Sequence, residues 1–241
     1  MSAIRNLIYK LGWDTRCRNI DVKRVLLPLI GPGTTILDAG CGEYGLSAFV
    51  SGARITGVDI LPAETVSAEL NYVHGSIVDL PFDPRSFDVA VSVDVLEHLP
   101  EDMRSVAVKQ LVKIAGQLIV ITFPCGADAR RLDEGFEREL TRRGQPVPDW
   151  LKEHLQNRYP EIDEIVAGIE AEAKRTGRVV STSVQYSENS TIARCLRWSA
   201  IRSKYLYLAN NLVAGVFLPL MPKAGAANAY RAIVVAEFDR D

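Results

Sequence analysis

Ile36-Leu-Asp38-Ala-Gly40-Cys-Gly42-Glu-Tyr-Gly45 joins a short apolar segment to a loop that contains three glycines. The apolar residues 46–50 follow the loop and predict the start of a helix. This order of strand, loop and helix lets a backbone approach a ligand closely, because glycine lacks a Cβ and tolerates positive φ. The helix N-terminus adds free N–H groups and the positive end of a dipole. The stretch therefore predicts a nucleotide-binding loop.

Strands and helices alternate outward from this loop. The hydrophobic pattern predicts strands at residues 34–39, 54–59, 71–74, 87–93 and 116–123. It predicts helices at 19–30, at 45–51, from Pro62, and from Pro100 to Gly116. Two further strands are expected at 178–186 and 229–238, with a helix from about Thr191 between them. This alternation indicates an α/β fold, a Rossmann-like doubly wound and mostly parallel sheet of seven strands.

Residues 125–177 break the alternation after the fifth predicted strand. They are charged and mostly helical in pattern, with prolines at 146, 148 and 160. Ligands of open α/β sheets bind beyond the carboxyl ends of the strands. We therefore expect a helical insertion that forms a lid over the substrate pocket, within one domain that spans residues 1–241. A solvated surface without substrate contacts is the alternative.

Composition limits the class of protein. The chain has 241 residues and a formal net charge of −2, which disfavours a general nucleic-acid binder, since these usually carry a basic excess. Its four cysteines lie far apart without metal-ligand spacing, which predicts a reducing, cytoplasmic location and no disulfide framework. The first residues lack the long apolar core of a signal peptide.

The glycine loop allows two interpretations. Gly40-Cys-Gly42-Glu-Tyr-Gly45 fits GxGxxG, and Asp59 follows at the distance of a ribose-binding acid, as in a nicotinamide-dependent oxidoreductase. Asp38 stands two residues before the first glycine. A carboxylate there favours a ligand with an ammonium group, because it would repel a pyrophosphate.

Four motifs in order now resemble one family. Beside the glycine loop these are Gly57-Val-Asp59-Ile, His74-Gly-Ser-Ile-Val-Asp79-Leu-Pro-Phe82 and Ser86-Phe-Asp88-Val-Ala-Val-Ser-Val-Asp94-Val-Leu-Glu97-His98-Leu. Together they resemble the class I S-adenosylmethionine-dependent methyltransferases, in the large group that acts mostly on small molecules. The resemblance covers residues 34–123, and the C-terminal half matches only in outline.

The resemblance implies roles for the motif residues at S-adenosyl-L-methionine. Gly40, Gly42 and Gly45 would let the backbone pass under the methionine and ribose, and Asp38 would help to hold the amino-acid end. Asp59 would accept hydrogen bonds from the ribose hydroxyls, and Ile60 would pack on the adenine. Where the family often has an acid at the adenine amino group, this chain has Ser76. Ser76 and the backbone of Ile77 are therefore the adenine contacts that we expect.

Asp94 and His98 are the candidate catalytic residues. Asp94 ends the fourth predicted strand and should border both cofactor and substrate. His98 follows near the expected reaction site, and an imidazole with a pKa near 6.5 suits a general base. A role for His98 as a loop cap is the alternative. No metal site is expected, because Glu97 and His98 have no further histidine close to them in the sequence.

Residues 194–221 bear on the acceptor. A basic segment with Trp198 precedes an apolar stretch, a pattern that fits either peripheral membrane contact or a core helix. The function that we predict is methyl transfer to an oxygen of a small molecule, with glycan or lipid-linked acceptors first and quinone-like or other metabolites second. The alternatives are a nicotinamide-dependent oxidoreductase and a non-catalytic S-adenosylmethionine-binding protein. Nucleic acid is not expected as a partner.

Overall fold

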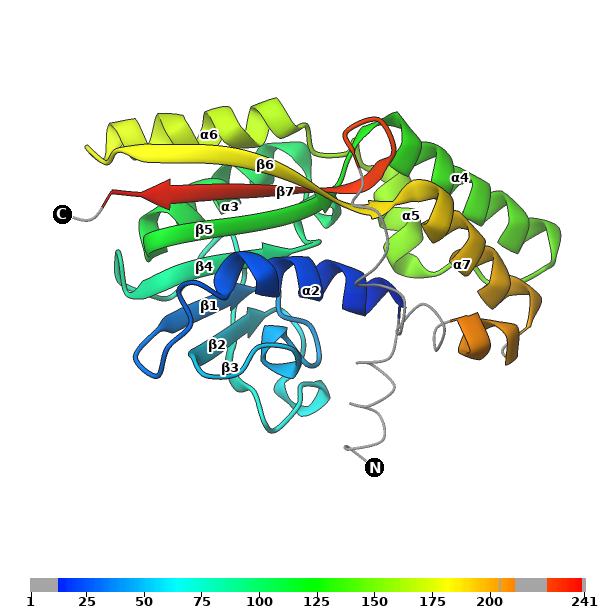
Figure 1. Cartoon of the computed structure of the whole chain (residues 1–241), viewed down its shortest axis with the longest axis horizontal. Helices are drawn as coiled ribbons and strands as arrows, with labels where there is room; N and C mark the ends of the chain where they lie inside the picture. The colour runs from blue at the N-terminus through cyan, green and yellow to red at the C-terminus, as the bar shows by residue number, and fades with distance from the viewer. Residues whose placement is uncertain (1–12, 204, 211–224, 240–241) are drawn as a thin grey trace.

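The computed structural model describes residues 13–203, 205–210 and 225–239. Its centre is a seven-stranded sheet with the strand order β3-β2-β1-β4-β5-β7-β6 (Figure 1). The strands are β1 (Thr35–Ala39), β2 (Arg54–Asp59), β3 (Asn71–His74), β4 (Phe87–Val93), β5 (Ala115–Pro124), β6 (Val180–Asn189) and β7 (Ala229–Phe238). Strands β1 to β5 pair in parallel, and β7 runs antiparallel to both β5 and β6. The predicted mostly parallel seven-stranded α/β fold is confirmed.

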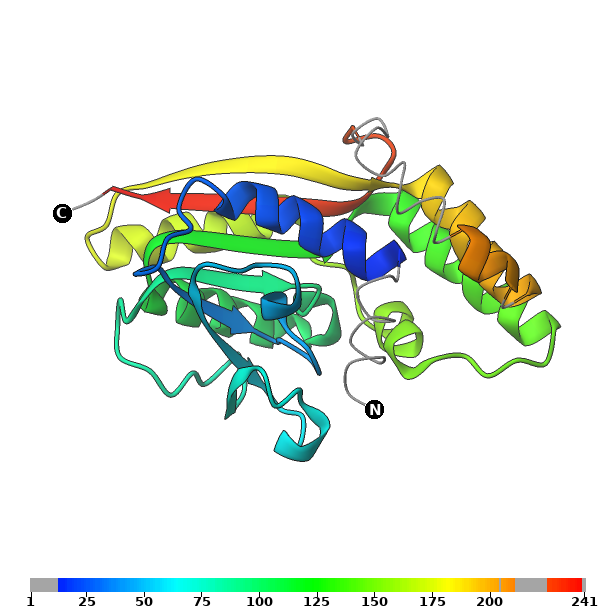
Figure 2. The ribbon, with the colours of Figure 1, turned by 60° about the horizontal axis from the view of Figure 1, so that its bottom comes forward.

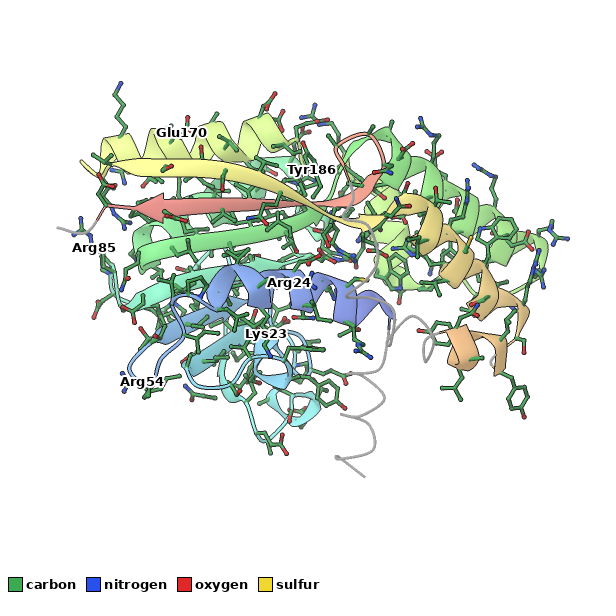
Figure 3. The ribbon with its side chains drawn as sticks, in the orientation of Figure 1. Lys23, Arg24, Arg54, Arg85, Glu170 and Tyr186 are labelled. Atoms are coloured by element: carbon green, nitrogen blue, oxygen red, sulfur yellow. The ribbon has the colours of Figure 1, made fainter. Side chains whose placement is uncertain are left out.

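Helices cover both faces of the sheet (Figure 2). On one face, α2 (Trp13–Leu26) buries Val22 and Leu26 against β1, β4 and β5. On the other, α3 (Glu101–Ile114) and α6 (Ile162–Arg175) pack together and bury apolar side chains spaced three or four residues apart. Arg24 on α2 and Glu170 on α6 are exposed, which is the polar side expected of such amphipathic helices (Figure 3).

The predicted insertion divides into two parts. Helices α4 (Gly126–Arg142) and α5 (Asp149–Gln156), with α7 (Ser190–Arg202), lie beyond the ends of β1, β4 and β5 (Figure 1). Helix α6 instead packs on α3 and the sheet, where Ile165 and Ile169 are buried in the main core. Of the predicted insertion, only α4 and α5 therefore lie where a lid over the substrate pocket is expected.

Several predicted helices differ from those observed. The helix expected at 45–51 is reduced to the 3-10 turn η1 (Leu46–Ala48), and that expected from Pro62 is η2 (Ala63–Thr65). Both segments are short and end in loops, so neither can form the successive hydrogen-bonded turns that make a helix stable. Helix α2 begins before residue 19 and ends at Leu26 rather than at 30.

The segment 194–221 is described only in part. Residues 205–210 form a helical turn whose Tyr205 and Leu208 side chains are 74% and 65% exposed, so this part is not a core helix. Residues 211–221 lie outside the described residues. Of the helices that are described, none has the length and apolar character needed to cross a bilayer.

Candidate active site

The glycine loop follows β1 and is shaped by backbone conformations that favour glycine. Gly40, Gly42 and Gly45 have φ values of 84°, 61° and 60°. A Cβ on Gly40 would lie 2.2 Å from a methyl carbon of Val95, so this glycine is required for packing. A Cβ on Gly42 would meet nothing within 4 Å. The loop therefore presents bare backbone to open space at Gly42, where a ligand can approach.

Asp59 holds this loop in place from the end of β2. One carboxylate oxygen accepts a hydrogen bond from the Gly42 N–H at 2.8 Å, and the other accepts from the Leu61 N–H at 3.1 Å. A carboxylate has about four acceptor positions, so it can accept further hydrogen bonds from a ligand. The side chain of Ile60, beside it, is 71% exposed and offers an apolar surface.

Asp38 lies buried beneath the loop. It is only 2% exposed, and its carboxylate accepts a hydrogen bond of 2.6 Å from the Leu46 N–H. Burial raises the pKa of Asp38 to about 6, and the nearby Asp59 adds to the rise. A cationic ligand group would favour the ionised form of this carboxylate.

The glycine loop and Asp38 line a cleft of about 430 Å³, the glycine-loop cleft, whereas Asp59 and Ile60 lie outside its lining. It is bounded by Arg18, Asn19, Asp38, Gly40, Cys41, Gly42, Glu43, Gly45, Leu46, Val93 and Asp94. Of the residues predicted at the adenine, Ser76 forms an isolated bridge with Asp79, and Ile77 is 6% exposed within the main core. Neither residue lines the cleft, and the adenine contacts of Ser76 and of the Ile77 backbone stay a prediction.

A second pocket, of about 400 Å³, lies beneath α4, α5 and α7. Its wall is partly aromatic and partly charged. It is formed by Arg18, Asp94, Glu97, His98, Phe136, Trp150, His154, Leu196, Arg197, Ala200, Tyr207, Tyr230 and Arg231. Arg18 and Asp94 line both cavities, so the second pocket and the glycine-loop cleft adjoin at the end of β4.

Asp94 stands at this junction and is tied to its neighbours. Its carboxylate accepts hydrogen bonds from Nε of Arg231 at 2.6 Å and from the Thr122 hydroxyl at 2.9 Å. A guanidinium nitrogen of Arg18 lies 3.5 Å away. These cationic and hydroxyl partners suit an ionised carboxylate that positions its surroundings more than one that accepts a proton.

His98 lies in the second pocket, on the 3-10 turn η3 (Leu96–His98). Its Nδ1 lies 2.6 Å from a carboxylate oxygen of Glu153 on α5. Burial lowers the pKa of His98, and the neighbouring His154 lowers it further. The imidazole is therefore favoured in its neutral form, with a nitrogen lone pair available.

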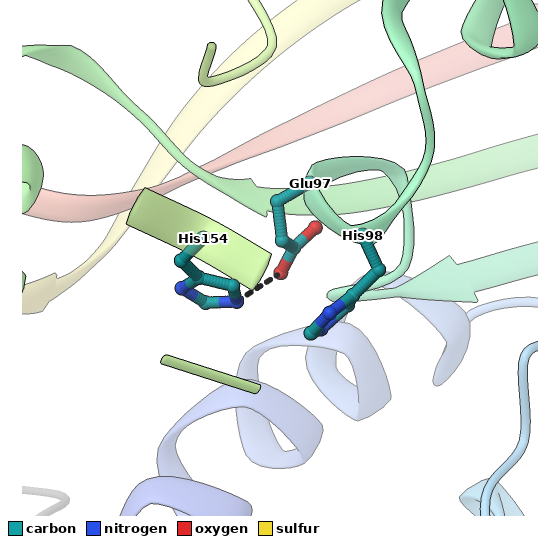
Figure 4. Close-up of side chains that lie close together, drawn as sticks. All are labelled: Glu97, His98 and His154. Atoms are coloured by element: carbon teal, nitrogen blue, oxygen red, sulfur yellow. Dashed lines mark ion pairs between the residues drawn. The ribbon is translucent and has the colours of Figure 1, made fainter. Parts of the chain in front are cut away.

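Glu97 and His154 lie beside His98 in the wall of the second pocket (Figure 4). Glu97 is fully buried, and Nε2 of His154 lies 3.7 Å from one of its carboxylate oxygens. Burial and the nearby Asp94 raise the pKa of Glu97 well above its ordinary value.

A buried carboxylate, Asp133 on α4, fixes His154. It lies 3.0 Å from Nδ1 of His154 and 2.6 Å from a guanidinium nitrogen of Arg197, and it also accepts from Tyr159 and Tyr230. Burial would raise the pKa of Asp133, but the hydrogen bond with His154 and the charge of Arg197 hold it below its usual value.

Sequence reasoning did not find four of these residues. Arg18 comes from α2, Asp133 from α4, Arg197 from α7 and Arg231 from β7. They carry no motif. Arg197 belongs to the basic segment before the apolar stretch, yet it points into the protein and packs over Tyr230. Of these four residues, only Asp133 had a signal in the sequence, because this acid directly follows an apolar residue of the predicted helical pattern.

Comparisons with known proteins agree with the fold and the loop. Residues 37–120 match a family described as a methyltransferase domain. The chain is 30% identical over 137 residues to the 2-methyl-6-phytyl-1,4-hydroquinone methyltransferase of Synechocystis sp., an alignment that covers 52% of this chain and 42% of that protein. It is 33% identical over 105 residues to the ubiquinone biosynthesis O-methyltransferase of Xanthomonas campestris pv. campestris, covering 38% and 44%. The chain thus spans less than half the length of these curated relatives.

A solved structure extends the likeness in fold. The phosphoethanolamine N-methyltransferase 2 of Haemonchus contortus, in complex with S-adenosyl-L-methionine, superposes with a TM-score of 0.54 at 17% identity. The match covers 93% of this chain and 52% of that one. The match over residues 37–120 and the sheet order together show a methyltransferase domain with the fold of the class I S-adenosylmethionine-dependent methyltransferases.

The methyl donor of this family, S-adenosyl-L-methionine, fits the residues present. The open face of Gly42 admits a ligand against the backbone, and Asp59 lies directly behind it with acceptor capacity for ribose hydroxyls. The buried Asp38 suits the donor's ammonium group, and the exposed Ile60 offers a surface for its adenine.

Proposed function

We propose that the protein transfers the methyl group of S-adenosyl-L-methionine to an oxygen atom of a small acceptor bound in the second pocket. One observation carries this proposal. Asp94 and Arg18 line both the glycine-loop cleft and the second pocket, so a donor in the first and an acceptor in the second would meet at the end of β4. Proximity and alignment are the main contributions of a protein to such a displacement.

Each part of the site would have a distinct role. When bound, the cofactor supplies a methyl group on a positively charged sulfur. The glycine loop, Asp38 and Asp59 would bind and orient it. Asp94, held by Arg231, would set the boundary between the two cavities. His98 would accept the proton of the acceptor hydroxyl, because its pKa is lowered and its ring is oriented by Glu153.

The lining of the second pocket supports an acceptor with an apolar or aromatic body. Phe136 and Trp150 are stacked with ring centroids 6.4 Å apart, and Tyr230 is part of the same wall. The two curated relatives are named for a hydroquinone and for ubiquinone biosynthesis. For both reasons we propose a quinol-like phenol as the first candidate acceptor, before a glycan or a lipid-linked acceptor.

Incubation with S-adenosyl-L-methionine labelled in its methyl group tests the proposal. Phenolic quinol precursors and hydroxylated glycans would be offered in parallel, with labelled products identified by mass spectrometry. We expect an O-methylated phenol and an equal amount of S-adenosylhomocysteine. Cofactor binding without labelled product from these acceptors or from a cell extract would instead support the non-catalytic alternative.

His98→Ala tests the role of His98 within this reaction. We expect kcat to fall at least tenfold while the Kd for S-adenosyl-L-methionine, measured by calorimetry, changes little. His74→Ala is the matched control, because this exposed histidine on β3 lines neither cavity. Full turnover by His98→Ala would remove His98 from catalysis.

A further inference from the structure

We propose that Glu97, His98 and His154 form a binding site for a divalent transition-metal cation in the wall of the second pocket. The sequence predicted no metal site, because no second histidine lies near Glu97 and His98. The fold supplies that ligand from α5, 56 positions beyond His98. One ligand atom from each of the three residues lies within 4.8 Å of the others.

The spacing suits a single ion. Ligand bonds of about 2.1 Å place the donor atoms about 3.0–3.4 Å apart around a tetrahedral or octahedral centre. The Glu97 oxygen and Nε2 of His154 are already 3.7 Å apart (Figure 4). The separations that involve His98 reach 4.8 Å, so a shift of about 1.4 Å in its partly exposed side chain would complete the set.

Glu97 gives a second, independent reason. Its side chain is fully buried, and within the described residues neither carboxylate oxygen has a hydrogen-bond partner. Burial of an unsatisfied carboxylate is costly, and buried charges are normally paired or coordinate metals. A cation between Glu97 and the two imidazoles would supply the missing partner.

Both histidines carry the outer partners that metal-bound imidazoles usually have. Nδ1 of His154 lies 3.0 Å from Asp133, and Nδ1 of His98 lies 2.6 Å from Glu153. A carboxylate on one ring nitrogen fixes the tautomer and leaves Nε2 as the lone-pair donor. At His154 that nitrogen is the one that faces Glu97.

The donor set indicates the kind of ion. Two imidazoles and one carboxylate suit zinc, cobalt, manganese or iron better than calcium, which prefers oxygen ligands alone. Three protein ligands leave at least one coordination position open, as catalytic rather than structural sites do. Because all three residues line the second pocket, the open position faces that cavity.

The use of this ion rests on the proposed function, although the site itself does not. A cation in the pocket would bind the acceptor oxygen and lower the pKa of its hydroxyl. The proton would then leave to solvent, an oxygen lone pair would form the new O–CH₃ bond, and the electrons of the broken S–CH₃ bond would stay on sulfur. With the cation bound, His98 would be a ligand, and the role of proton acceptor given to it under the proposed function would apply to the metal-free protein.

Cobalt binding to the full chain, freed of tags and of metal by a chelator, tests the site. Co²⁺ is titrated without S-adenosyl-L-methionine, and binding is followed by calorimetry and by the visible absorption of the coordinated ion. We expect one Co²⁺ per chain. We expect Glu97→Gln, His98→Asn and His154→Asn each to weaken binding at least tenfold, and His74→Asn to leave it unchanged.

The readout separates this site from the function proposed above. One-to-one binding that needs all three residues supports the site even if no acceptor is methylated. Absence of one-to-one binding, or affinity that survives any of the three substitutions, overturns it. Circular dichroism checks the fold of each variant, and the partly exposed His98 keeps the test decisive if a buried substitution impairs folding.

Discussion

The carboxylate of Asp94 and the guanidinium of Arg231 form a hydrogen-bonded ion pair of 2.6 Å between β4 and β7. The two side chains are 7% and 3% exposed. The same guanidinium pairs with Glu188 at the end of β6. One arginine from the antiparallel strand therefore balances two buried acids at the junction of the two cavities.

Loss of Arg231 should be costly to the fold. In Arg231→Met, Asp94 and Glu188 would remain buried without this cation, and breaking a buried pair on one side costs about 3–5 kcal/mol. We expect a loss of this size in the free energy of unfolding, measured with urea. Arg231→Met combined with Glu188→Gln should recover part of it, because one unpaired charge is removed.

Arg142→Met is the control for this ion pair. Arg142 is 66% exposed, and its partner Glu139 would keep a second arginine, Arg143, at 2.6 Å, so the loss of Arg142 should leave stability nearly unchanged. Equal stability of Arg231→Met and Arg142→Met would contradict the role assigned to the buried pair.

The local part of the fold was predictable from the sequence. Alternation and β-branched residues gave β2, β3, β4 and β7 with their observed bounds. The motif residues Asp38 and Asp59 do meet around the glycine loop. These features depend on neighbours in sequence, which a pattern records directly.

The second pocket depended on contacts between distant segments, which no local pattern records. His154 approaches Glu97 only because α5 folds back over η3, and Arg231 reaches Asp94 across 137 positions. The prediction of a helix at 45–51 was wrong for a different reason, although these residues are neighbours in the sequence. Its apolar residues Leu46 and Val50 were correctly buried, but burial did not require a helix.

Asp59→Ala should weaken binding of S-adenosyl-L-methionine at least tenfold, about 1.4 kcal/mol. The substitution removes the acceptor proposed for the ribose and frees the Gly42 N–H that shapes the loop. Isothermal calorimetry measures the effect. Glu64→Ala, an exposed acid on η2 nearby, should bind as the unaltered protein does. Unchanged affinity in Asp59→Ala would reject the ribose assignment.

Cofactor affinity should depend on pH through Asp38. Its pKa is raised to about 6, so the carboxylate gains a proton as the pH falls from 7 to 5. The amino group of the cofactor stays protonated in this range. The attraction between Asp38 and the amino group is therefore lost on acidification. The Kd for S-adenosyl-L-methionine should rise as the pH falls through about 6. Asp38→Asn should bind more weakly at pH 7 and show a flatter profile.

The same shift has a consequence for the ligand-free protein. A pKa of Asp38 above its ordinary 3.8 means that the folded state holds this proton more tightly than the unfolded state. The stability gained is complete below about pH 4 and is lost as the pH rises through about 6. The difference in unfolding free energy between wild type and Asp38→Asn should therefore change with pH in this direction. A difference in unfolding free energy that does not change with pH would contradict the raised pKa of Asp38.

Gly42→Ala separates the fold of the loop from its use. Gly42 has φ of 61° with open space where a Cβ would lie, so alanine there should cost only the strain of positive φ, about 1–2 kcal/mol. The added methyl would nevertheless occupy space proposed for the cofactor. Gly177→Ala is the matched control, since Gly177 has φ of 70° and equally open surroundings after α6. Urea unfolding should show similar losses for both variants, whereas calorimetry should show at least tenfold weaker binding of S-adenosyl-L-methionine for Gly42→Ala alone. Equal affinities in the two variants would mean that the cofactor does not lie against Gly42.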